Sequence, residues 1–188
     1  MKNIIFITVV IVFVMVSCNP KNKQAETTNT LIMKNDSKMN SAQSSNASIN
    51  EVVANYLKLK NNLVNDNSKE AANSGNALVT TIGKVDMNSI SKEQMKDYMD
   101  IADDAKEHAE HIVSNGGDIA HQREHFVMLS KDVNDLIQLF GTNQKLYQDF
   151  CPMADDNKGA IWISETKEIK NPYFGSQMAT CGSIKKEF

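Results

Sequence analysis

The sequence predicts an all-α protein, an antiparallel four-helix bundle with an irregular or short-stranded C-terminal arm. Apolar residues recur every three or four positions in four successive segments. Capping and turn residues separate these segments, and the helical period stops after Gly141. Because short connections join amphipathic helices to antiparallel neighbours, the four segments are expected to bury their apolar stripes against one another.

The first two predicted helices lie between residues 49 and 82. The first begins at Ile49, and its apolar stripe consists of Val52, Tyr56, Leu59 and Leu63. The second follows the capping candidates Asp66, Asn67 and Ser68. Its apolar positions are Ala71, Ala72, Leu78, Val79 and Ile82.

The third and fourth predicted helices flank a Gly-containing turn. Ser91 and Gln94 form a capping box at the start of the third. Its stripe consists of Met95, Tyr98, Ala102, Ala105, Ala109 and Ile112, with Met95 and Met99 expected in the core. The turn is Asn115-Gly116-Gly117-Asp118. The fourth helix has the apolar positions Ile119, Phe126, Leu129, Val133, Leu136 and Phe140.

The arm after Gly141 lacks a helical period. Pro152 and Pro172 prevent a long helix there. Three short apolar runs are expected to be strands or extended segments: Leu146-Tyr147, Ile161-Trp162-Ile163 and Cys181 to Ile184.

The N-terminus has the pattern of an exported lipoprotein. Residues 1–17 combine Lys2 with a short apolar run and predict a signal peptide. Met15-Val16-Ser17-Cys18 is similar to a bacterial lipobox, so Cys18 is the expected lipidation site. An uncleaved signal anchor is the alternative. Lipid on Cys18 would anchor the chain to a membrane of the bacterial cell envelope, facing the periplasm or the cell exterior.

The remaining chain predicts a tether and one domain. Residues 18–47 are rich in Asn, Ser, Lys and Thr and are expected to be a flexible linker, because they hold too little apolar surface to fold. Residues 48–188 are the predicted domain. The net charge of −3 and the aromatic content of 6% argue against a nucleic-acid partner.

Sulfur-containing residues form the first candidate site. With Cys18 assigned to lipid, the other two cysteines are Cys151 and Cys181, and Met153 and Met178 lie near them in the sequence. Thiolates and thioethers are soft ligands that suit Cu(I) or another soft heavy metal. The exported compartment also permits a structural disulfide between the two cysteines. Both interpretations remain open from the sequence.

Four histidines form a second candidate metal site. His108 and His111 precede the turn at Gly116, and His121 and His125 follow it. In a helical hairpin they would lie at similar heights and could bind Zn or Cu(II). Because the rotational phase of the two helices is unknown, the imidazoles either converge or diverge as part of a solvated polar face with Glu107, Glu110 and Glu124.

The chain is predicted not to be an enzyme. The sequence lacks a His-Glu-x-x-His metalloprotease motif, the Glu-x-x-His pairs of a di-iron bundle and a Gly-x-Ser-x-Gly elbow. An enzyme that uses the four histidines is a third, weaker interpretation.

Several motifs of the C-terminal half occur together in one known family. They are Glu107 to Ile112, Gln122 to Phe126, Cys151-Pro152-Met153-Ala154, Trp162-Ile163-Ser164, Ile169 to Gly175 and Met178 to Gly182. Over residues 50–186 the chain resembles a bacterial domain-of-unknown-function family of small secreted lipoproteins. The same module is appended to periplasmic adaptor proteins of copper/silver-type efflux pumps. The resemblance implies heavy-metal handling and makes Cys151, Met153, Met178 and Cys181 the candidate ligands.

Together these observations predict a lipid-anchored protein that binds Cu(I) or a similar heavy metal outside the cytoplasm. Its role would be buffering, or handover to a heavy-metal efflux system as partner. The alternative is a non-enzymatic interaction module in which Cys151 and Cys181 form a structural disulfide.

Overall fold

The structure is a computed structural model that describes residues 48–188. The predicted signal peptide (1–17), the lipidation site Cys18 and the linker (18–47) lie outside the described residues. No helix in the described part is both long enough and apolar enough to cross a membrane.

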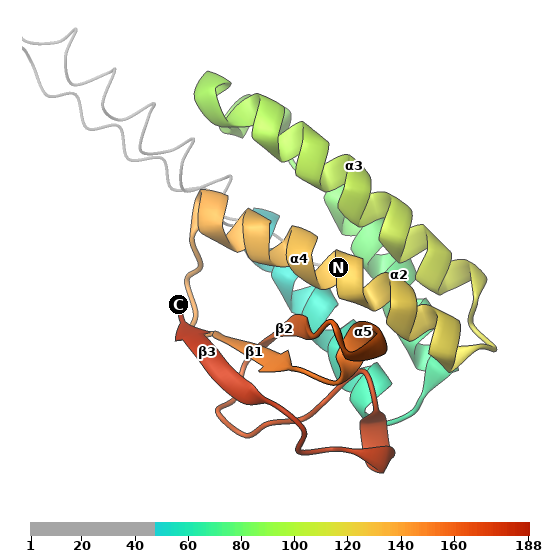
Figure 1. The fold of residues 1–188 in the computed structure, drawn as a ribbon. Coiled ribbons are helices and arrows are strands. Elements are labelled where there is room, and N and C mark those ends of the chain that lie inside the picture. Colours follow the sequence, from blue (N-terminus) through green and yellow to red (C-terminus); the bar gives the residue numbers. More distant parts are fainter. Residues whose placement is uncertain (1–47) are drawn as a thin grey trace, which may run out of the picture.

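The helices begin and end close to the predicted boundaries (Figure 1). The first helix includes residues 48–64, and α2 (Ser68–Ile82), α3 (Lys92–Ser114) and α4 (Ile119–Phe140) follow it. Asn67 and Ser91 are the N-caps of α2 and α3, and each side-chain oxygen accepts a hydrogen bond from a backbone N–H of the first turn. A short 3₁₀ helix, η1 (Met87–Ser89), connects α2 to α3.

Apolar contacts hold α4 between α3 and the C-terminal part of the chain. α2 packs on α3, α3 packs on α4, and the opposite side of α4 contacts the sheet (Figure 1). Tyr56 of the first helix stacks on Phe126 of α4, with ring centroids 5.2 Å apart. Its hydroxyl lies 2.8 Å from Ser130 Oγ and accepts a hydrogen bond from the Ile163 N–H. Tyr56 therefore joins the first helix to both α4 and the sheet.

The C-terminal part, predicted to be an irregular or short-stranded arm, is a small antiparallel sheet. The strands are β1 (Tyr147–Cys151), β2 (Ala160–Ser164) and β3 (Ser183–Glu187), in the order β2-β1-β3. β2 contains one of the three runs expected to be extended, and β1 and β3 each overlap one of the other two by one or two residues. Buried and half-buried residues alternate along β1, which is the pattern of a strand with one face on a core. The protein is therefore mostly helical with a three-stranded sheet.

Between β1 and β2 the chain makes a left-handed turn, α5 (Ala154–Asn157). Asp155, Asp156 and Asn157 have φ values of 51°, 52° and 66°. This region of backbone space is unfavourable for most residues, and Asp and Asn tolerate it best. A short 3₁₀ helix, η2 (Gly175–Gln177), lies between β2 and β3.

One buried amide fixes the ends of three helices relative to one another. Gln122 is fully buried in α4. Its Nε2 donates to the carbonyl of Ser68 at 2.9 Å and to that of Ile112 at 3.0 Å. The start of α2, the end of α3 and the start of α4 therefore meet at one point.

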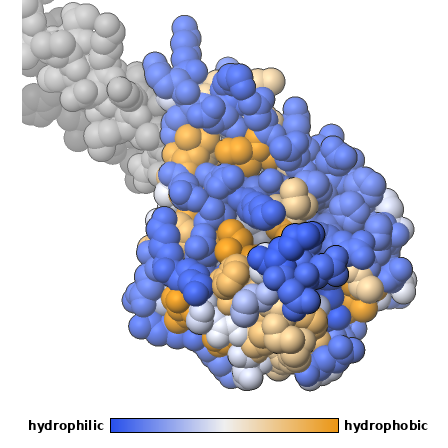
Figure 2. Space-filling model, viewed as in Figure 1, coloured by the Kyte–Doolittle hydropathy of each residue, from blue (hydrophilic) through white to orange (hydrophobic). Residues whose placement is uncertain are grey.

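The methionines of α3 differ from one another. Met95 packs against the core as predicted, whereas Met99 is 48% exposed, so its assignment to the core is wrong. Met99 lies one residue beyond Tyr98 on the helix, which turns its side chain away from the stripe. On the face in Figure 2, apolar residues form separate patches within a mainly hydrophilic surface.

Candidate metal centre

The four histidines converge between the end of α3 and the start of α4. His108 and His111 lie in the last two turns of α3, and His121 and His125 lie in the first two turns of α4. The Asn115-to-Asp118 turn reverses the chain, and Asp118 caps α4 by accepting from the N–H groups of Ala120 and His121. The sequence left open whether the four imidazoles converge or diverge, and in the structure they converge.

His125 is the centre of this group. Its ring stacks on His111 with centroids 4.3 Å apart, meets His121 edge-on at 4.8 Å and lies 6.0 Å from His108. The Nε2 atoms of His121 and His125 are 3.2 Å apart. One ring nitrogen from each of His111, His121 and His125 lies within 4.8 Å of the others. We call these three residues the histidine cluster.

A carboxylate sets the orientation of one member of the cluster. Glu124 Oε2 lies 3.0 Å from His121 Nδ1. A proton on Nδ1 leaves the Nε2 lone pair facing His125. Metal-binding histidines usually have such an outer carboxylate, because it fixes both the tautomer and the ring plane. Sequence reasoning placed Glu124 only on the solvated face.

Burial keeps part of the group neutral. The pKa of His108 is lowered mainly by burial. The pKa of His125 is lowered by burial and then by the neighbouring His111, His121 and His108. A metal binds the neutral form of imidazole, so lowered pKa values reduce the competition from protons.

The two cysteines of the domain also meet. Cys151 ends β1, Cys181 precedes β3, and their Sγ atoms lie 2.6 Å apart with both thiols free. Gly182 allows Cys181 to lie this close to Cys151. A Cβ at position 182 would lie 2.7 Å from the Trp162 ring, and the backbone φ there is 150°. The hydrogen bond to Cys151, followed by burial, raises the pKa of Cys181 to about 11.

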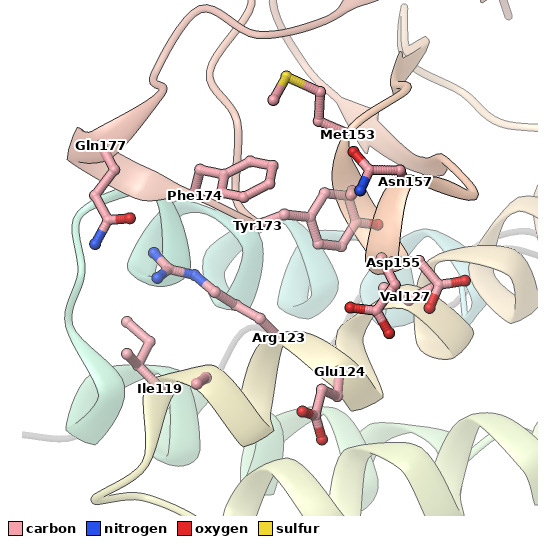
Figure 3. Close-up of a pocket in the computed structure, with 13 residues that line it drawn as sticks. Ile119, Arg123, Glu124, Val127, Met153, Asp155, Asn157, Tyr173, Phe174 and Gln177 are labelled. Atoms are coloured by element: carbon pink, nitrogen blue, oxygen red, sulfur yellow. The ribbon is translucent and has the colours of Figure 1, made fainter.

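The methionines predicted as ligands are placed differently from the cysteines. Met153 is 46% exposed and lines a pocket of about 720 Å³ to which neither cysteine contributes (Figure 3). Met178 follows η2 and is half-buried, and its carbonyl accepts a hydrogen bond from the Cys181 N–H. The structure thus brings the two thiols together, and it puts Met153 on the wall of a separate pocket.

Asn171 holds the segment that carries Cys181. Its side chain is fully buried and donates to the Cys181 carbonyl at 2.7 Å. Its Oδ1 accepts from the N–H groups of Tyr173 and Phe174. Because these bonds fix the turn on one side and Cys181 on the other, this segment has the scaffold role that its Pro-containing turn suggests.

Arg123 attaches the same segment to the helices. It reaches from α4 toward Phe174 and Gln177 (Figure 3). Its Nε donates to the Pro172 carbonyl at 2.8 Å, and its Nη2 donates to the Leu63 carbonyl at 2.8 Å and to Asp66 Oδ1 at 2.6 Å. With these donors satisfied by the protein, Arg123 is an anchor.

The chemistry of the two sites is distinct. Three neutral imidazoles can hold Zn(II), Cu(II) or a similar borderline ion. Two adjacent thiols can form a disulfide, or bind a soft metal once they separate and ionise.

A comparison with protein families identifies the helical part. A family model described as protein of unknown function (DUF3347) matches residues 52–145, half of the chain. The matched range contains all four histidines and ends before the two cysteines of the sheet. No curated protein and no solved structure matches the chain. The chain belongs to this family, the protein-of-unknown-function family DUF3347.

Proposed function

We propose that this chain is a heavy-metal-binding protein that acts outside the cytoplasm and holds its ion at the histidine cluster. The observation that supports this best is the approach of three imidazole nitrogens to within 4.8 Å of one another. Nitrogens bound at about 2.1 Å to one tetrahedral ion lie roughly 3.4 Å apart, so small side-chain rotations would complete the site. Without an ion this crowding stabilises the fold little, because it opposes protonation of the rings and supplies few other contacts.

The surroundings of the cluster favour a cation. Glu124 lies against His121, and Glu107 and Glu110 flank His108 and His111 on α3. Exposed carboxylates at this end of the helix pair raise the local concentration of positive ions. Zn(II) and Cu(II) are the expected ions, because both prefer imidazole nitrogen.

The cellular role is part of the same proposal. A signal peptide at 1–17 and lipid on Cys18 would keep the domain at a membrane of the cell envelope. The four helices would act as an antiparallel bundle that carries the metal centre. The resemblance to a module of copper/silver efflux adaptors supports copper as the physiological metal, and buffering or handover to an efflux system as the role. No reaction is proposed.

A Cu(I) site at the cysteines is the second candidate. The adjacency of Cys151 and Cys181 supports it, with Met153 and Met178 as weaker thioether ligands. The spacing of 2.6 Å is, however, shorter than the roughly 3.7 Å between two thiolates on one tetrahedral ion. The arrangement therefore favours a disulfide that fastens the segment before β3 to β1, in an oxidising compartment that preserves it.

A titration separates these candidates. The purified full-length chain is titrated with Zn(II) or Cu(II) against a competing chelator. We expect one tightly bound ion per chain, lost in His121→Ala/His125→Ala and retained in Cys151→Ser/Cys181→Ser. Gln138→Ala, an exposed change on the same helix, is the matched control. Unchanged binding in the double histidine variant would refute the proposal.

A further inference from the structure

A buried polar pair lies directly beside the histidine cluster. His108 of α3 faces Asp132 of α4, with Nε2 and Oδ2 3.9 Å apart. The side chains are 20% and 15% exposed. Among the described residues, neither His108 Nδ1 nor Asp132 Oδ2 has a hydrogen-bond partner, although both atoms are inaccessible to solvent.

This arrangement is unfavourable as it stands. Buried polar atoms almost always have partners, and a buried polar atom without one destabilises the folded chain. At 3.9 Å the pair is too far apart for a hydrogen bond. The carboxylates Asp104 and Asp135 add negative charge near Asp132, which Lys131 offsets only in part. The pair therefore lacks a component that supplies positive charge and a bonding partner.

His108 and Asp132 lie so close to the histidine cluster that an ion bound there would supply the missing positive charge. The His108 ring lies 6.0 Å from the His125 ring, and His125 contacts both other members of the cluster. His108 and His111 are also one turn apart on the same side of α3. Rotation of the His108 ring would bring a nitrogen toward the ion without moving either helix.

We propose that His108 is the fourth ligand of the ion bound by the histidine cluster, and that Asp132 is the positioning residue that orients it. The inference rests on the proposed function. Asp132 Oδ2 would accept the Nε2–H of His108, and Nδ1 would bind the ion. Both unpartnered atoms would then be satisfied. Glu124 already stands in the same relation to His121, at 3.0 Å.

The same arrangement explains why a carboxylate is kept in this buried position. An aspartate without a partner gains nothing for the folded chain, because desolvation opposes its charge. Once the ion binds, its positive charge and the imidazole N–H both stabilise the carboxylate. Asp132 thus becomes favourable only in the loaded protein.

A double-mutant cycle on the full-length chain tests this role, with Zn(II) affinity measured against a chelator. Asp132→Asn should weaken binding by about 10- to 100-fold, the usual effect of losing an outer partner. Asp97→Asn, the same change of charge at an exposed position on α3, should alter affinity by less than about threefold. In a His108→Ala background, Asp132→Asn should have no further effect, because its partner is already gone.

A spectroscopic readout makes the test independent of folding defects. Co(II) bound to the parent chain should give the intense visible absorption of a four-coordinate site, and His108→Ala should weaken or shift it. Parent-like Zn(II) affinity in Asp132→Asn, or an equal loss in the His108→Ala background, would overturn the inference while leaving the cluster intact. Absence of Zn(II) binding by the parent chain would instead overturn the proposed function itself.

Discussion

His121 and His125 present their Nε2 atoms to each other at 3.2 Å, one helical turn apart on α4. His111 stacks on His125 from α3, so imidazoles from two helices meet at a single ring. A site on packed helices is more rigid than one on loops. The Gln122 amide fixes the phase of these helices through the Ile112 carbonyl. The geometry of the cluster is therefore set by the core beneath it.

Removal of His125 should abolish tight metal binding. His125 is the one imidazole in contact with all three others. His125→Ala should therefore lower the Zn(II) affinity by more than about 100-fold, which is the largest loss usual for a residue that only hydrogen-bonds to a ligand. The measurement is competition against a Zn(II) chelator. Circular dichroism should show an intact helical fold, since His125 is only partly buried. Affinity within threefold of the parent would contradict the assignment.

The cysteine pair should act as a disulfide in protein isolated without reductant. Thiol titration should then find no free thiol at Cys151 and Cys181. Reduction should lower the free energy of unfolding by about 3.6 kcal/mol, because the bridge closes a loop of 30 residues. Cys151→Ala/Cys181→Ala should be insensitive to reductant in urea unfolding. Two free thiols in air-exposed protein would favour the soft-metal interpretation.

The methionines provide a separate test of the soft-metal site. Met153→Leu with Met178→Leu keeps the side-chain volume and should cost little stability. Since Met153 lines a pocket apart from the cysteines, we expect unchanged Cu(I) uptake by the reduced protein. A loss of Cu(I) affinity, measured against a Cu(I) chelator, would show that the thioethers are ligands after all.

Arg123 should contribute strongly to stability. It is 13% exposed and donates to the carbonyls of Leu63 and Pro172 as well as to Asp66. Hydrogen bonds from charged groups are worth about 1.5–3 kcal/mol each, so Arg123→Met should lower the free energy of unfolding by about 3 kcal/mol. Urea unfolding measures this, with the exposed Lys131→Met as control. Equal effects of the two variants would contradict the anchoring role.

Asp149 should make stability depend on pH. It is fully buried in β1 without a hydrogen-bond partner for its carboxylate among the described residues, and burial raises its pKa to about 6. The folded chain then binds more protons than the unfolded chain between about pH 4 and 6. Stability from this group is therefore lost as pH rises through that window, by at most about 3 kcal/mol.

Asp149→Asn isolates this effect, because the amide does not titrate. Urea unfolding at pH 4 and pH 7.5 should show that the variant gains stability relative to the parent at the higher pH. If the free energies of unfolding of parent and variant differ by the same amount at pH 4 and at pH 7.5, the result would contradict the burial of a charged Asp149.

Local signals predicted the helices well. Asn67, Ser91 with Gln94, and Gly141 mark boundaries through hydrogen bonds or backbone angles that depend on a few neighbouring residues. Short apolar runs indicated extended segments after Gly141, but the pairing of β1 with β3 joins residues far apart in the chain, so no local pattern revealed how the strands pair. The left-handed turn at Asp155 and Asp156 was equally hidden, although their residue types are those that tolerate it.

The sequence identified the histidines of the candidate site, but it did not give their geometry. Spacing placed the four histidines at one end of a helix pair, but their convergence depends on the rotational phase set by core packing around Gln122. Asp132 was missed, although it lies seven residues after His125 and therefore on the same side of α4. Its proposed role rests on a buried carboxylate oxygen that has no hydrogen-bond partner in the described part of the chain, which only the structure reveals.

Electron paramagnetic resonance of the Cu(II)-loaded full-length chain tests the proposed metal centre most directly. Hyperfine coupling to imidazole nitrogen reports histidine ligands whatever the affinity. A metal centre at the histidine cluster predicts one bound Cu(II) with coupling from several imidazoles, and loss of that signal in His121→Ala/His125→Ala. A Cu(II) signal without imidazole coupling, or one that survives in the double variant, would contradict a metal centre at the histidine cluster.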